Sequence, residues 1–182
     1  LIHLAAEAGA DVAKFQHFEA RSIVSDFGFK NLKSGMSHQE TWSKSVFEVY
    51  EEASVDTSWT SDLAAACKDA GIGFFTSPYS PKIVDEVDPF VSAFKIGSGD
   101  ITWHEMIRAV ARKRKPYILA AGASTMDEVR EAVRVGLEIN PELALLQCNT
   151  NYTASLENFR HIQLRVLNAF SEEKAFKTLR SE

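Results

Sequence analysis

The feature that most constrains this chain is a regular alternation between short apolar segments and segments with helical periodicity. Five apolar segments are predicted to be strands, namely residues 11–18, 72–76, 91–96, 116–121 and 143–147, and helical sequence follows each of them. This alternation is typical of a parallel sheet, because parallel neighbours need a long crossover connection that is usually a helix. The fingerprint of a dinucleotide-binding Rossmann fold, GxGxxG after a strand, is missing from all five segments.

One connection is much longer than the others. Residues 19–56 separate the first strand from the next predicted helix, and they include an amphipathic stretch at 42–52. Loops longer than about 15 residues are uncommon in compact domains and are often functional. We therefore expect this excursion to combine a binding loop with a structural extension that has its own aromatic core. The other predicted helices are residues 1–8, 60–71, 81–87, 103–112, 126–139 and 155–170.

The strand at 91–96 contains a lysine, Lys95, and runs directly into Gly97, Ser98 and Gly99. A strand that is buried on both faces reads as a continuous apolar run, so this lysine points into a core or a pocket. Charged lysine is almost never fully buried without a partner, and an anionic ligand is one such partner. The alternative is a lysine whose ammonium group reaches the rim of the sheet. This segment alone favours the two interpretations equally.

Polar residues also occur near the ends of other predicted strands. Lys14 and Gln16 are two residues apart, so they point to the same side of their strand. Ser77 follows the second strand, Asp100 follows the third, and the segment 149–152 follows the fifth. If the strands are parallel neighbours, these groups converge at one mouth, where two lysines and several hydrogen-bond donors suit a ligand with more than one anionic group.

The carboxyl ends of the strands are where a (β/α)8 TIM barrel keeps its active site. A full barrel takes about 250 residues, so a chain of 182 residues would hold roughly five of the eight strands. The predicted fold class is therefore α/β, an incomplete (β/α)8 barrel with about strands 2 to 6. We expect residues 1–182 to form one partial catalytic domain with 19–56 as a loop insertion.

Composition excludes several other classes. The formal net charge of −5 argues against a nucleic-acid partner and against a membrane surface, and no apolar run approaches the ~18 residues of a membrane span. Cys67 and Cys148 do not form a CxxC pair, so neither a disulfide framework nor a zinc site is expected. These features predict a cytoplasmic protein. The chain opens in the middle of a helical pattern without an initiator Met, as a fragment would.

Five segments, taken in order, resemble the sialic acid synthase (N-acetylneuraminate synthase) family: residues 9–16, 74–79, 94–100, 122–129 and 146–152. The resemblance implies a TIM barrel that condenses phosphoenolpyruvate with N-acetylmannosamine or a related amino sugar and releases phosphate. It also implies assistance by Mn2+ or Mg2+ and a homodimer for the full-length enzyme.

The roles of individual residues follow from the same resemblance. Lys95, Ser98 and Lys14 would hold phosphoenolpyruvate, while Gln16 and Asp100 would contact the sugar. The implied catalytic residues are Lys14, Lys95 and Asp100, and the implied substrate-binding residues are Gln16, Ser77, Ser98, Thr150 and Tyr152. The family's metal-binding histidines come from strands seven and eight, so no metal ligand is expected in this chain.

The resemblance is incomplete at one phosphate-binding position. The family has Ser-Thr-Gly after its fifth strand, whereas this chain has Ala120, Ala121 and Gly122, with Ser124 as a possible replacement hydroxyl. The fragment is expected to be inactive alone. Two other functions remain open: a class I aldolase in which Lys14 or Lys95 forms a Schiff base, and a non-catalytic module that binds a sugar acid or phosphate.

Overall fold

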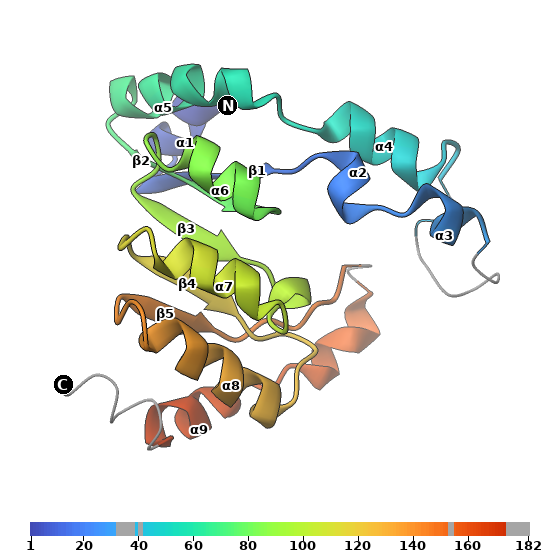
Figure 1. Cartoon of the computed structure of the whole chain (residues 1–182), viewed down its shortest axis with the longest axis vertical. Helices are drawn as coiled ribbons and strands as arrows, with labels where there is room; N and C mark the ends of the chain where they lie inside the picture. The colour runs from blue at the N-terminus through green and yellow to red at the C-terminus, as the bar shows by residue number, and fades with distance from the viewer. Residues whose placement is uncertain (32–38, 40–41, 153–154, 174–182) are drawn as a thin grey trace.

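The computed structural model describes residues 1–31, 39, 42–152 and 155–173, and it contains one parallel sheet (Figure 1). The sheet has five strands in the order β1-β2-β3-β4-β5, the same order as in the sequence. All five strands lie where the alternating pattern predicts them: β1 Val12–His17, β2 Gly73–Pro78, β3 Ala93–Ile96, β4 Tyr117–Ala120 and β5 Leu143–Leu146.

Helices follow the strands and pack on one face of the sheet (Figure 1). Their bounds are α1 Ile2–Glu7, α5 Thr60–Asp69, α6 Pro81–Val87, α7 His104–Ala111, α8 Met126–Leu137 and α9 Val166–Glu172. The first turns of α8 and α6 show why these two helices begin where the sequence predicts. Thr125 and Glu128 form a reciprocal capping box on α8, and Ser80 caps α6 with Pro81 in its first turn.

The hydrophobic core lies between the sheet and these helices. Four side chains are at most 1% exposed: Phe94 and Ile96 of β3, and Tyr117 and Leu119 of β4. The register places all four on the face that the helices cover. Burying one such side chain contributes about 1.5–3 kcal/mol. The helix-facing half of each strand therefore carries the stability of the fold and leaves the other half free for function.

The opposite face of the sheet carries the polar residues that the sequence singled out. The register pairs Lys14 with Phe75 and Phe75 with Ala93, so these residues share one face. Lys95 lies two residues after Ala93 and points to the same side. Along this inner face the strands remain partly open to solvent, and Leu146 of β5 is 43% exposed.

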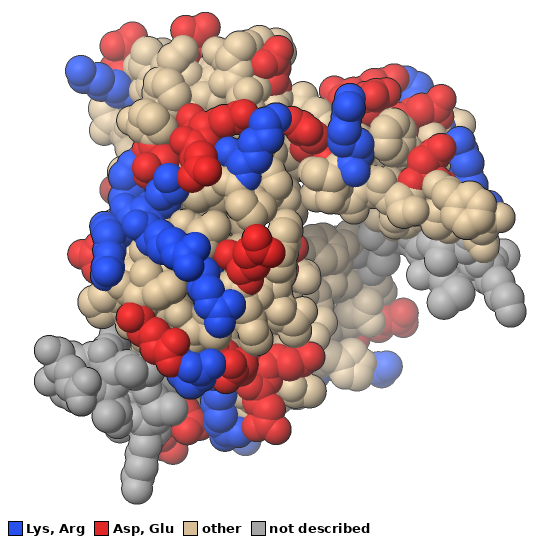
Figure 2. All heavy atoms as spheres, in the orientation of Figure 1, with Lys and Arg blue, Asp and Glu red and all other residues tan. Residues whose placement is uncertain are grey.

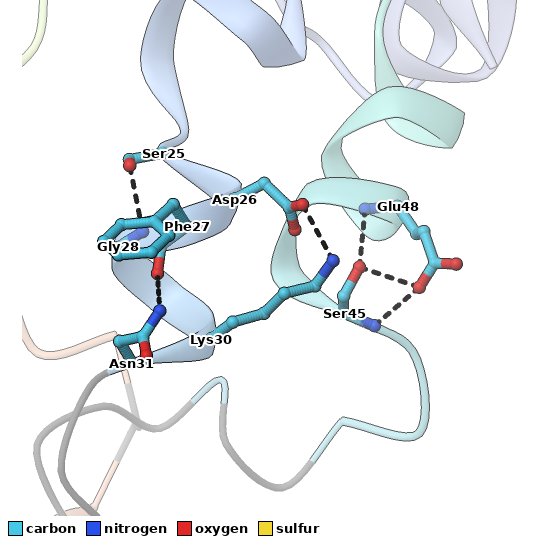
Figure 3. Close-up of polar contacts among 8 residues, drawn as sticks. All are labelled: Ser25, Asp26, Phe27, Gly28, Lys30, Asn31, Ser45 and Glu48. Atoms are coloured by element: carbon cyan, nitrogen blue, oxygen red, sulfur yellow. Dashed lines mark hydrogen bonds and ion pairs between the residues drawn. The ribbon is translucent and has the colours of Figure 1, made fainter.

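The described residues of 19–56, here called the arm, extend from the end of β1 (Figure 1). The arm contains α2 Ala20–Ile23, α3 Asp26–Lys30 and α4 Val46–Ala53, so the helix predicted at 42–52 begins later. Ser25 caps α3, an ion pair of 2.8 Å joins Lys30 to Asp26, and Ser45 forms a capping box with Glu48 on α4 (Figure 3).

Aromatic rings contact one another where the arm meets the end of β1. Tyr50 packs against Phe18 and Trp42, with ring centroids 5.6 and 6.4 Å apart. Val46 and Val24 are also buried there. The expected aromatic core is met only in part: these rings contact one another, but Trp42 is 37% exposed and Phe27 is 79% exposed. Residues 32–38 and 40–41 of the expected insertion lie outside them.

The predicted helix at 155–170 is wrong. Two short helices replace it, the 3-10 helix Leu156–His161 and then α9, and Ile162 between them has an extended backbone with ψ of 125°. No residue of the 3-10 helix is buried. Its apolar residues have no core to pack on, so nothing stabilises one continuous amphipathic helix there.

The edge where the strands begin, here called the base, is held by charged residues. Lys113 lies 2.8 Å from Asp85, and Lys115 lies 3.0 Å from Asp88. Lys115 also donates to the carbonyl of Val91 at 3.0 Å. Figure 2 shows lysine and arginine side chains gathered beside acidic ones on the left side of the view. None of the described helices is long and apolar enough to cross a bilayer.

Candidate functional site

The two strand lysines lie on the same face of the sheet, Lys95 near the edge where the strands end, here called the mouth, and Lys14 nearer the middle of β1. Burial lowers the pKa of Lys14, and the nearby charge of Lys95 lowers it further. Neither lysine forms an ion pair with any residue that the structure describes. Two like charges on one face without a carboxylate between them form a site that an anion would stabilise.

Tyr79 links β1 to the region after β3. The side chain of Gln16 donates a hydrogen bond of 2.7 Å to the Tyr79 hydroxyl, and the Tyr79 backbone N–H donates to the carbonyl of His17 at 3.0 Å. Burial raises the pKa of Tyr79, and the charge of Asp100 raises it further. Burial also raises the pKa of Asp100, which is half-buried.

A cavity of about 800 Å³ lies between the mouth and the arm. Lys14, Gln16 and Tyr79 line it from the sheet, and Tyr152 lines it from the segment after β5. The arm supplies apolar and aromatic residues: Ile23, Val24, Phe29, Trp42, Val49, Tyr50, Ala53 and Val55. Figure 2 shows the arm overhanging a hollow beside the sheet. An apolar wall with a few convergent polar groups is typical of a small-molecule site.

A second cavity, of about 440 Å³, lies beside the ends of β3, β4 and β5. Ser98, Ser124, Thr150 and Tyr152 line it, so Tyr152 borders both cavities. The Gly122 backbone N–H donates to the Ser98 hydroxyl at 3.0 Å, and the Ser124 hydroxyl donates to the Gly122 carbonyl at 3.0 Å. The Ser98 hydroxyl, which acts as an acceptor in its contact with the Gly122 N–H, keeps its own hydrogen for an anion at the strand ends, whereas the Ser124 hydrogen is already donated to Gly122.

Gly122 has to be glycine because the strand ends pack around it. A Cβ there would lie 2.5 Å from Thr150 Cγ2, 2.7 Å from the Cys148 carbonyl and 2.9 Å from Ser98 Oγ. The backbones of Ala123 and Thr150 have positive φ angles of 52° and 53°. Such angles are uncommon for residues other than glycine, and they concentrate at functional sites.

The structure places the predicted site residues unequally. Lys14 and Gln16 line the larger cavity, and Ser98 and Thr150 line the smaller one. Lys95 and Asp100 line neither of these two cavities: Lys95 shares the sheet face of Lys14, and Asp100 ends the short 3-10 helix after β3. Ser77 and Tyr152 stand apart from this group. Ser77 pairs with Gln16 but is only 2% exposed, whereas Tyr152 is 77% exposed at the rim of both cavities.

Sequence reasoning missed Tyr79 and the aromatic residues of the arm. Tyr79 follows Ser77 by two residues, and this spacing after a strand that ends at the mouth could have identified it. Phe18 and Trp42 could not have been placed from the sequence, since their position depends on how the arm folds back toward β1.

The structure also bears on the expected metal. In the part of the chain that it describes, no three His, Cys, Asp or Glu side chains lie close enough together to hold a metal ion. The described residues therefore do not fit a complete Mn2+ or Mg2+ site. The metal remains a prediction from the family resemblance.

Comparison with known proteins identifies the family. The NeuB family model matches residues 1–178, nearly the whole chain. This chain belongs to the NeuB family. The chain spans about half the length of the curated relatives it matches.

Relatives in this family are sugar-acid synthases. The chain is 30% identical over 164 residues to a pseudaminic acid synthase of Campylobacter jejuni, covering 86% of this chain and 46% of that protein. It is 27% identical over 173 residues to the human N-acetylneuraminate-9-phosphate synthase, covering 94% of this chain and 46% of that protein.

The solved structures extend the comparison to the fold. An N-acetylneuraminic acid synthetase from Leptospira borgpetersenii, solved with citrate, matches with a TM-score of 0.74 and 20% identity. The match covers 93% of this NeuB chain and 54% of that one. The predicted α/β barrel architecture and the family resemblance are both confirmed: the five parallel strands correspond to part of the barrel of such synthases.

Proposed function

We propose that this NeuB-family chain binds phosphoenolpyruvate between Lys14 and Lys95 and contributes that site to the condensation of phosphoenolpyruvate with an amino sugar. The observation that carries the proposal is the pair of lysines on one face of the sheet without an acidic partner. Phosphoenolpyruvate carries a phosphate and a carboxylate, and each can accept charge-assisted hydrogen bonds from an ammonium group.

The chemistry assigns a role to each side of the mouth. The methylene carbon (C3) of phosphoenolpyruvate forms a bond to the aldehyde carbon of the open-chain sugar, and the aldehyde oxygen takes up a proton to become a hydroxyl. Water adds to the cationic carbon (C2) that bears phosphate and loses a proton, and the bond from C2 to the phosphate oxygen then breaks, which releases phosphate and leaves a 2-keto acid. Lys14 and Lys95 balance the negative charge of the donor throughout these steps. Gln16 lines the larger cavity, and the Asp100 carboxylate lies near the Tyr79 hydroxyl, so both can hold sugar hydroxyls.

Calorimetric titration of the full chain with phosphoenolpyruvate tests the binding site. Lys95→Met and Lys14→Met should each weaken binding by about 10- to 100-fold, because each removes a charge-assisted hydrogen bond. Lys68→Met is the matched control, since Lys68 is exposed on α5, away from the mouth, and its loss should leave binding unchanged. Equal affinity in all four proteins would rule out the lysine pair as the binding site.

The lowered pKa of Lys14 favours a second candidate, a class I aldolase, because a Schiff-base lysine needs a neutral amine. Borohydride treatment in the presence of pyruvate distinguishes the two functions. A reduced adduct on Lys14 or Lys95, found by mass spectrometry, would support the aldolase. No labelled lysine is expected if the pair binds an anion.

Turnover separates the synthase from a non-catalytic binding module. The expectation that this chain is inactive alone predicts phosphoenolpyruvate binding without phosphate release when N-acetylmannosamine is added. Release of phosphate in step with formation of a sugar acid would contradict that expectation and would show that the chain is itself a synthase. The test is run with and without Mn2+, so that dependence on metal is measured at the same time.

A further inference from the structure

We infer that Tyr79 is a specificity residue that holds one hydroxyl group of a polyhydroxy ligand together with Asp100. The inference rests on the proposed function for the class of ligand and adds a residue to its sugar side. It begins with the Tyr79 hydroxyl, which accepts a hydrogen bond from the Gln16 side chain.

The Tyr79 hydroxyl has a free hydrogen. Gln16 Nε2 donates to its oxygen at 2.7 Å, so that oxygen acts as the acceptor in this contact. No acceptor for the phenol hydrogen occurs among the residues that the structure describes. The side chain lines the larger cavity, and the hydrogen is therefore available to a ligand there.

The ring is held firmly enough to direct that hydrogen. Phe18 packs against it edge-on, with ring centroids 6.0 Å apart, and the Tyr79 backbone is attached to the end of β1 through the carbonyl of His17. The contact with Gln16 adds a third constraint. A donor that is oriented before the ligand arrives loses little entropy on binding.

Asp100 supplies the complementary acceptor. Asp100 Oδ2 and Tyr79 Oη lie 3.7 and 3.8 Å from the same point, the position that a Cβ would take on Gly97. No hydrogen bond joins the two groups, and the Asp100 carboxylate has no donor within the described ranges. A ligand hydroxyl is both donor and acceptor, so it can accept from Tyr79 while it donates to Asp100.

Glycine at position 97 keeps this space open. A Cβ there would be in ordinary van der Waals contact with both oxygens and would take up part of the space between them. The Asp100 carboxylate is negatively charged and would repel a phosphate placed beside it. A neutral sugar hydroxyl suits this environment better than a second phosphate.

The test titrates the full chain with N-acetylmannosamine followed by NMR, with and without phosphoenolpyruvate. Tyr79→Phe keeps the ring and removes only the hydroxyl, and it should weaken sugar binding by about five- to tenfold. Phosphoenolpyruvate binding should stay within about twofold, because Tyr79 does not belong to the lysine pair. Tyr117→Phe is the matched control, since that hydroxyl contacts the Asn140 carbonyl in the core, away from the mouth.

A double-mutant cycle with Asp100→Asn shows whether the two residues hold the same hydroxyl. If they do, Tyr79→Phe should cost less than about twofold in the Asp100→Asn background, because the shared contact is already lost. The resonance of the Gln16 side-chain amide should also shift in Tyr79→Phe, which reports the contact between them directly.

Two outcomes would overturn the inference: unchanged sugar affinity in Tyr79→Phe, or no sugar binding by the unaltered chain. If the losses of sugar affinity from the two substitutions were additive in the cycle, Tyr79 and Asp100 would not hold the same hydroxyl. A different pattern identifies failure of the proposed function. If sugar binding depended on Tyr79 but phosphoenolpyruvate did not bind, the proposed phosphoenolpyruvate site would be wrong, and Tyr79 would still be a ligand-binding residue.

Discussion

The mouth and the base of the sheet use lysine in opposite ways. At the base, Lys113 and Lys115 lie within 3.0 Å of the carboxylates of Asp85 and Asp88. On the inner face that leads to the mouth, Lys14 and Lys95 have no acidic partner among the described residues. The base lysines are satisfied within the chain, whereas the mouth lysines lack a partner that the ligand would supply.

This contrast separates structural lysines from functional ones on physical grounds. Position in the sequence does not separate them, because Lys95 and Lys115 both lie in or directly before an apolar strand segment. The presence or absence of an acidic partner does separate them. A like-charged pair without counterions costs stability, and functional sites commonly carry that kind of cost.

Crowding at Gly122 gives the largest expected effect on stability. Gly122→Ala should lower the free energy of unfolding by about 3 kcal/mol, because the new methyl group would overlap Thr150, the Cys148 carbonyl and Ser98. Urea unfolding measures this change. A loss of this size would show that the mouth depends on close packing of three strand ends, whereas ion pairs join the elements at the base.

Gly99→Ala is the matched control at the same edge. A Cβ on Gly99 has nothing within 4 Å, so stability should change by less than about 0.5 kcal/mol. Equal effects of the two substitutions would show that the mouth tolerates added volume. The packing around Gly122 would then not be what fixes the position of Ser98.

Sequence reasoning reached the strands and the shared face because both depend on local pattern. The apolar runs located all five strands, and the two-residue spacing of Lys14 and Gln16 placed them on one side. It failed at residues 155–170, where periodicity suggested a helix but no core was available to stabilise it. Periodicity records which residues could be buried together, and tertiary packing decides whether they are.

The candidate site was predictable only in part for a related reason. Lys14 and Lys95 lie in strands of one parallel sheet and Asp100 follows β3, so topology and register bring them to the same side of the molecule. The contact between Gln16 and Tyr79 depends on side-chain geometry, and the cavity wall depends on the folded arm. Residue spacing could have indicated Tyr79 as a mouth residue, but it gives neither this contact nor the cavity wall.

Stability measurements on single lysine substitutions test the contrast between the two edges. Lys115→Met should destabilise the fold by about 1–2 kcal/mol, because Asp88 and the Val91 carbonyl both lose a donor. Lys95→Met should leave stability unchanged or raise it by about 0.5 kcal/mol after solvent screening, because it removes repulsion with Lys14. Urea midpoints provide the comparison.

Lys44→Met serves as the control for loss of an ordinary ion pair. Lys44 lies 2.6 Å from Glu52 on the arm, but both side chains are more than half exposed, so the change should stay within about 0.5 kcal/mol. If Lys95→Met destabilised the fold as much as Lys115→Met, the mouth lysine would be a structural residue, and the contrast would fail.

The smallest expected effect is the change in the free energy of unfolding with pH in the alkaline range. This effect distinguishes the mouth from the base most directly. The pKa of Lys14 is lowered from 10.5 by burial and by Lys95, so between that lowered value and 10.5 the unfolded chain binds more protons and stability rises with pH. The pKa of Lys113 is raised above 10.5, mainly by its hydrogen bond to Asp85, so its contribution is present below 10.5 and is lost as pH rises through the raised value. Relative to the unaltered chain, Lys14→Met should remove the rise and Lys113→Met should remove the fall, each by less than about 1 kcal/mol. Urea midpoints measured from about pH 8 to pH 11 give both slopes, and slopes of the same sign for the two variants would show that the mouth and the base do not differ in the way their lysines are held.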